Sequence, residues 1–342
     1  MTLARFVVNK LMAVWLVLFA IIAFLAPRPF TVLSPSVNYL LGGVIFIMSL
    51  TLDAGALARV FARPKALIAG FVIKWATVPL AGYAAANLVY AHHPQLAAGT
   101  IVDGSTPAGV SSNLFAYIGH GAVSLAVSLT FVHTLIAPLL TPAFTSAMAS
   151  KFVHVSFWSL FSQMLQIVVV PVALGLAVRY GVKPERTRRA EPLLPLISAL
   201  LLYAIVLGLC SKASAAVHAH LGLMPLIAGT AAVLVIVNLA VGYLLARLAG
   251  LEEAAARTVM FDTGVYNSGL GAVLASASFG PFAALPALLN TVLNLIIGAL
   301  LSSWLQNRPT AAAAPAPAVA APALAMTDAG DSLNPQRRNT QL

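Results

Sequence analysis

Charged residues are scarce in this chain. Only 8% of its 342 residues are Asp, Glu, Lys or Arg, whereas a soluble domain carries about 25%. Cysteine occurs once, as Cys210, which excludes an internal disulfide framework and a cysteine-based metal site. With 60% hydrophobic residues, the composition predicts an all-α polytopic membrane protein and argues against a soluble domain.

Two further absences narrow the class of protein. The apolar N-terminal run meets Ala26-Pro27-Arg28 without a small-x-small cleavage site, so we interpret it as a first spanning helix and not as a removed signal peptide. The net charge of +10 comes with no nucleic-acid-binding motif. Basic loops are typical of the cytoplasmic side of membrane proteins, so we expect a lipid bilayer around the chain and no nucleic-acid partner.

Ten apolar runs approach the roughly 20 residues that a helix needs to cross a bilayer. They lie near 8–26, 36–55, 66–90, 95–118, 121–148, 155–180, 192–212, 223–249, 253–278 and 282–306. The sequence therefore predicts a membrane domain of ten helices over 1–306. The Ala/Pro-rich remainder, 307–342, lacks an apolar pattern and is predicted to be a disordered cytoplasmic tail.

Basic residues are distributed unevenly between the two sides that ten spans define. One side, with both termini, holds nearly all of them, and the other holds only Arg28, Lys151 and Lys212. By the positive-inside rule, both termini are predicted to be cytoplasmic in a bacterial-type inner membrane.

Three ionisable residues fall inside predicted spans: Lys74, Asp103 and Asp262. A charge at the bilayer centre costs about 2.5–3.5 kcal/mol even on the lenient insertion scale, so such residues face a cavity or a partner. Intramembrane charges typically mark ion or substrate pathways.

The fourth and ninth spans share a pattern of acid, glycine-containing break and Asn. One contains Asp103, Pro107 and Asn113, and the other contains Asp262 and Asn267. Each of these spans is the fourth helix of a set of five, and this predicts two inverted five-helix repeats, about 8–148 and 155–306. Interrupted helices at matching positions of inverted repeats point to the binding site of a secondary transporter. Close helix packing is an alternative for Gly269 and Gly271, but it does not explain two buried acids.

Several motifs resemble the bile acid:sodium symporter family over about residues 8 to 306. They are Phe46-Ile47-Met48-Ser49-Leu50-Thr51-Leu52, the segment from Pro107 to Asn113, Leu139-Leu140-Thr141-Pro142 and Asn267-Ser268-Gly269-Leu270-Gly271. The resemblance implies a panel domain of spans 1, 2, 6 and 7 and a core domain of spans 3–5 and 8–10. It further implies that spans 4 and 9 cross at their breaks. Bacterial members of the family are sodium symporters of small organic anions, including bile-acid-like and pantoate-like substrates.

The resemblance also implies a sodium site. Its ligands here would be Ser112, Asn113, Thr130 and Asp262, which offer the hard oxygens that sodium needs. The chain departs from the family at this site, because Asp262 stands where Glu is usual and Phe131 where a hydroxyl is common.

A second family sodium site is not expected in this chain. Lys74 and Tyr266 stand where the family has Gln, and an ammonium could take the electrostatic role of that sodium. Lys74 could instead carry a coupling proton together with Asp262, or form a fixed ion pair. Asp103 is a further coupling candidate, because it could pair with Lys74 or line the entry path.

The substrate carboxylate is expected where the two interrupted helices cross. The expected ligands are half-helix N–H groups with Ser111, Ser112, Asn267 and Asn294. For Asn294, a hydrogen bond between helices is an equal alternative. His133 is more typical of a hydrogen-bonded packing residue than of a proton relay.

The predicted function is secondary active symport of a small organic anion by alternating access, without an enzymatic reaction or an obligate protein partner. An intramembrane aspartyl protease that uses Asp103 and Asp262 is one alternative, although the Gly-x-Gly-Asp motif of such enzymes is missing. A membrane receptor that does not transport is the other.

Overall fold

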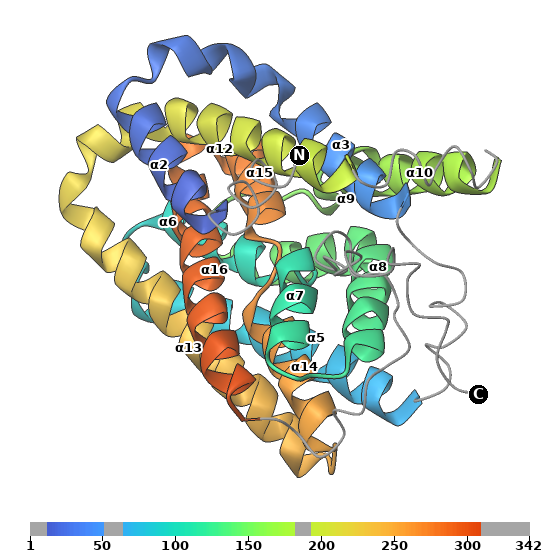
Figure 1. The fold of residues 1–342 in the computed structure, drawn as a ribbon. Coiled ribbons are helices and arrows are strands. Elements are labelled where there is room, and N and C mark those ends of the chain that lie inside the picture. Colours follow the sequence, from blue (N-terminus) through green and yellow to red (C-terminus); the bar gives the residue numbers. More distant parts are fainter. Residues whose placement is uncertain (1–11, 51–63, 182–192, 309–342) are drawn as a thin grey trace, which may run out of the picture.

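The computed structural model describes residues 12–50, 64–181 and 193–308, and this part of the chain is almost entirely helical (Figure 1). The elements are α2 (Met12–Leu25), η1 (Arg28–Ser36), α3 (Val37–Leu50), α5 (Pro64–Leu88), α6 (Pro94–Gly104), α7 (Val110–Ile118), α8 (Val123–Ala149), α9 (Phe157–Met164), η2 (Leu165–Val169), α10 (Val170–Gly181), α12 (Leu194–Ala219), η3 (Leu221–Leu223), α13 (Met224–Leu248), α14 (Glu253–Gly264), α15 (Ser268–Phe279), η4 (Pro281–Ala284) and α16 (Leu285–Gln306). The predicted tail lies almost wholly outside the described residues.

Seven helical stretches in the described ranges are long and apolar enough to cross a membrane. Helices suit that environment because they satisfy their own backbone hydrogen bonds. The predicted fourth and ninth spans are each divided in two. The halves α6, α7, α14 and α15 have 11, 9, 12 and 12 residues, so none of them alone has spanning length.

The helices pack in two groups. In the first, α12 contacts α2 and α3, and α3 contacts α10; Figure 1 shows α3, α10 and α12 along one side of the molecule. In the second, α13 contacts α5, α14 and α16, while α6 contacts α5 and α15. The second group contains all four half-helices and therefore the site described below.

Close packing of α6 against η4 requires glycine at position 99. A Cβ added to Gly99 would lie 1.8 Å from the backbone oxygen of Ala283. This contact joins the first interrupted helix to the segment that follows the second one.

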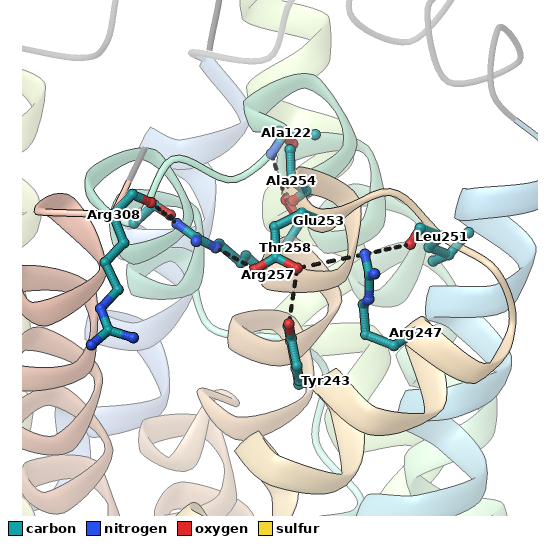
Figure 2. A network of polar contacts seen from close by, with 10 residues as sticks. Ala122, Tyr243, Arg247, Leu251, Glu253, Ala254, Arg257, Thr258 and Arg308 are labelled. Carbon is teal, nitrogen blue, oxygen red and sulfur yellow. Dashed lines mark hydrogen bonds and ion pairs between the residues drawn. The ribbon is translucent and has the colours of Figure 1, made fainter. Parts of the chain in front are cut away.

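A polar network holds the N-terminal end of α14 in place (Figure 2). The Arg257 guanidinium donates to Glu253 Oε1 at 2.8 Å, to the Gly119 backbone oxygen at 3.0 Å and to the Arg308 backbone oxygen at 2.8 Å. Tyr243 donates to Glu253 Oε2 at 2.8 Å. The network ties α14 to α13 and to the C-terminal ends of α7 and α16.

Candidate functional site

The two interrupted helices meet at their breaks. The Gly109 N–H donates to the Val265 oxygen at 3.0 Å, and the Asn267 N–H donates to the Pro107 oxygen at 2.8 Å. These bonds make an isolated antiparallel bridge between Ala108 and Tyr266. Backbone groups that the breaks release from helical bonding thus satisfy one another.

Both breaks follow from their residues. Proline lacks the N–H that a helix would use, so Pro107 ends the regular pattern between α6 and α7. Asn267 is the N-cap of α15, and its side chain accepts a hydrogen bond from the Leu270 N–H at 3.1 Å. The N-termini of α7 and α15 therefore begin beside the crossing, where their free N–H groups and dipoles favour an anion.

Two of the predicted sodium ligands are in direct contact. Thr130 Oγ1 donates to Asn113 Oδ1 at 2.9 Å, which joins α8 to α7. Ser112 is buried, and its hydroxyl donates to the Gly109 oxygen at 2.7 Å. Each hydroxyl uses its proton in these bonds and keeps lone pairs that can accept or ligate.

Asp262 belongs to a chain of three buried side chains. The Trp75 indole N–H, which can only donate, points at His133 Nδ1 at 2.8 Å. The proton of a neutral His133 ring must then be on Nε2, which lies 2.9 Å from Asp262 Oδ2 and donates to it. Phe71 stacks on the His133 ring with a centroid distance of 5.4 Å.

The second carboxylate oxygen of Asp262 is free to ligate. Asp262 is 1% exposed, and its Oδ1 has no hydrogen-bond partner among the described residues. His133 and Thr130 are three residues apart on α8 and so lie on one face of that helix. Asp262 therefore faces the same side of α8 as the Asn113–Thr130 pair.

Lys74 is buried without a direct partner. It is 1% exposed, and in the described part of the chain its Nζ makes no hydrogen bond. The ammonium lies 5.3 Å from the centre of the Tyr266 ring and 5.8 Å from that of Trp75, within cation–π range. It interacts at longer range with both Asp262 and Asp103, but no ion pair fixes it to either acid.

Asp103 has partners of its own. Asn290 Nδ2 donates to Asp103 Oδ2 at 2.7 Å and to Ser268 Oγ at 2.9 Å. Asn294, one turn further along α16, donates to the Tyr266 backbone oxygen at 3.1 Å. Asn294 thus forms a hydrogen bond from α16 to the break before α15, which agrees with the alternative that it bonds between helices.

Most of the polar side chains described above form two clusters near the crossing, which combine predicted site residues with His133, Ser268 and Asn290. We name the first the Asp262 cluster, which contains Asn113, Thr130, His133 and Asp262. The second is the Asp103 cluster, which contains Asp103, Ser268, Asn290 and Asn294. Ser111 and Asn267 are half-buried beside the breaks.

The two acids do not form a protease dyad. Asp262 bonds with His133 and Asp103 with Asn290, and no described hydrogen bond joins the two carboxylates. A dyad needs two carboxyl groups close enough to share a proton.

Sequence reasoning missed Asn290, and it predicted that His133 is hydrogen-bonded without identifying its partners, Trp75 and Asp262. A signal for Asn290 is present, because it is an amide within an apolar span and lies four residues before Asn294, on the same helix face. The partners of His133 could not be read from spacing, because they depend on how α5, α8 and α14 pack.

This fold defines a helical protein with several candidate membrane spans, and it buries Lys74, Asp103 and Asp262 near the crossing of two interrupted helices. The chain matches the model of the Sodium Bile acid symporter family over residues 39–220. It is 31% identical to the uncharacterized sodium-dependent transporter YocS of Bacillus subtilis over 297 residues, 85% of this chain and 89% of that protein.

Relatives in plants and animals extend this likeness. The probable chloroplastic sodium/metabolite cotransporter BASS1 of Arabidopsis thaliana is 30% identical over 88% of this chain and 75% of its own length. The human ileal sodium/bile acid cotransporter is 28% identical over 73% and 71%. The chain belongs to the sodium bile acid symporter family, which consists of sodium-dependent transporters and not of enzymes.

Proposed function

We propose that this protein is a secondary active symporter that carries a small organic anion by alternating access, coupled to sodium at one site. The observation that carries the proposal is the crossing of the two interrupted helices, with an acid beside each break. Two half-helix N-termini offer an anion site there, while carboxylate, amide and hydroxyl oxygens nearby suit a cation.

The Asp262 cluster fits sodium. Its oxygens come from Asn113, Thr130 and Asp262, with Ser112 adjacent, and Asp262 Oδ1 is a buried acceptor without a partner. Sodium bound here would neutralise the carboxylate and link α7, α8 and α14. The described residues contain no group of three or more His, Cys, Asp or Glu that could hold a metal ion, so the proposed sodium ligands are mainly neutral amide and hydroxyl oxygens with one carboxylate.

The anion would bind beside the sodium. Ser111, Ser112 and Asn267 lie at the starts of α7 and α15, and Asn294 supports the Tyr266 backbone at the break. Lys74 adds a buried positive charge that favours an anionic substrate. We further propose that Lys74, with Asp262 and Asp103 in electrostatic range, carries a coupling proton in place of the family's second sodium.

The full architecture belongs to the same proposal. Ten spans in two inverted repeats, 8–148 and 155–306, would give a panel of α2, α3, α9–α10 and α12 and a core of the remaining helices. The two packing groups support this division. Both termini would be cytoplasmic, in the plasma membrane.

Uptake into proteoliposomes tests the function. Radiolabelled pantoate and a bile acid serve as probes, and sodium and pH gradients are imposed separately. We expect an inward sodium gradient to drive accumulation, and we expect Asp262→Asn to abolish it while the purified protein stays monodisperse. Asp103→Asn should reduce uptake less. A folded Asp262→Asn variant that concentrates substrate like the parent would refute the site.

A further inference from the structure

A small cavity opens beside the Asp103 cluster, away from the proposed sodium site. It is lined by Tyr90, Thr100, Asp103, Thr230 and Asn290, together with apolar groups of α13 and α16. It has room for about one water-sized particle. None of the residues around it belongs to the Asp262 cluster.

Three residues that line this cavity, Tyr90, Asp103 and Asn290, each have a buried oxygen without a hydrogen-bond partner among the described residues. Asp103 is 3% exposed and Asn290 is 1% exposed. Asp103 Oδ1 and Asn290 Oδ1 each make no hydrogen bond with the described residues. A buried polar atom without a partner costs about 1–3 kcal/mol, so the two acceptor oxygens of Asp103 and Asn290 at one cavity favour the binding of a ligand there.

Most donor groups of the residues that line the cavity already donate hydrogen bonds to other protein atoms. The Asn290 amide nitrogen donates to Asp103 and Ser268, which fixes the orientation of that amide. Thr100 Oγ1 donates to the Leu96 oxygen at 2.9 Å, and Thr230 Oγ1 donates to the Leu226 oxygen at 2.8 Å. The cavity is thus left with carboxylate, amide and hydroxyl lone pairs, and Tyr90 is its one lining hydroxyl that can turn either way.

A set of oxygen acceptors with one negative charge matches a hard monovalent cation. A divalent ion would call for more carboxylates. Lys74 acts on Asp103 only at longer range, without an ion pair, so it leaves the free carboxylate oxygen available. We propose that Asp103 and Asn290, with the adjacent Thr100 and Thr230, bind a cation of the size of sodium, at a site that is separate from that at Asp262 and additional to the one coupled sodium of the proposed function.

Binding of radioactive sodium to the purified full-length protein tests the site, with choline chloride holding the ionic strength constant. We expect two sodium ions per chain in the parent. Asp103→Asn and Asp262→Asn should each lose one, and the double variant should lose both. Potassium should compete weakly, because the cavity is small.

The single variants separate this proposal from the proposed function. If Asp262→Asn loses all sodium, or if Asp103→Asn still binds two ions, the second site is refuted and the cavity holds water. If Asp103→Asn loses one ion while Asp262→Asn loses none, the second site stands and the site proposed at Asp262 falls.

Thr230→Val keeps the test decisive if Asp103→Asn does not fold. Removing one neutral oxygen should raise one of the two sodium Kd values by roughly threefold to tenfold. Thr291→Val is the matched control, because its hydroxyl also bonds back along a helix, to the Ala287 oxygen at 2.8 Å, but it does not line the cavity. Equal sodium binding in both variants and the parent would overturn the proposal.

Discussion

The Trp75 side chain on α5 determines which tautomer a neutral His133 adopts on α8. Its indole N–H occupies His133 Nδ1, which leaves the other ring nitrogen as the donor to Asp262. The histidine thereby orients a carboxylate that faces the proposed sodium site. A supporting residue of this kind locks the geometry of a ligand without touching the ion.

Thr130 provides a conservative test of the proposed sodium site. Thr130→Val removes the oxygen that bonds to Asn113 Oδ1 and nearly preserves the side-chain shape. We expect the sodium concentration for half-maximal uptake to rise about threefold to tenfold, with maximal uptake largely retained. Uptake measured over a sodium titration gives both quantities.

Thr134→Val is the control for that experiment. In the described part of the chain, the Thr134 hydroxyl bonds to the Thr130 backbone oxygen, at 2.7 Å, so its removal should leave the sodium titration unchanged. Ser112→Ala and Asn113→Ala should shift the titration in the same direction as Thr130→Val. A parent protein without any sodium dependence would show that this is not a sodium site.

Lys74 distinguishes this chain from the family pattern, which has Gln at that position. Its ammonium has no fixed partner in the described structure, so it can change its interactions when the site opens. We expect Lys74→Gln to lose the response of uptake to an imposed pH gradient and to retain sodium dependence. Should the variant still follow the pH gradient as the parent does, Lys74 is structural and carries no proton.

At the scale of elements, α6 and η4 approach so closely that position 99 cannot carry a side chain. Gly99→Ala would place a methyl group against the Ala283 oxygen, and we expect it to destabilise the protein by about 1–3 kcal/mol through overpacking. The unfolding midpoint in detergent measures this. Gly229→Ala, within α13 with nothing near its added Cβ, should leave the midpoint unchanged or raise it. Equal midpoints for both variants would contradict the observed packing.

The interrupted helices were predictable because their signals are local. Pro107 and the glycines near both breaks lower the local stability of a helix, although Gly269 and Gly271 lie within α15 and Pro138 lies within α8. The partners of the buried polar groups were not predictable in the same way. The sequence around Asn290 is the same whether its side chain bonds to Asp103 or to the backbone of a neighbouring helix, so it does not identify the partner. The separation of Lys74 from both acids depends on side-chain positions across α5, α6 and α14, which no spacing within one helix determines.

At the scale of the whole molecule, polar contacts join helices of the proposed panel to helices of the proposed core. One of them joins α9 to α15, where Gln163 Nε2 lies 3.4 Å from Ser278 Oγ. Alternating access requires the panel and core to move relative to each other. The proposed mechanism therefore predicts that a contact of this kind breaks or slides during each transport cycle.

Cross-linking across this contact tests that movement. In a Cys210→Ala background, which removes the chain's one cysteine, we expect Gln163→Cys/Ser278→Cys joined by a short bis-maleimide to lose sodium-driven uptake. The control pair, Asn87→Cys/Lys151→Cys, replaces a hydrogen bond of 2.7 Å within the core group. It should keep uptake after cross-linking, because both residues move with the same body. Unchanged uptake in a fully cross-linked Gln163–Ser278 protein would rule out relative motion of the two groups at this contact.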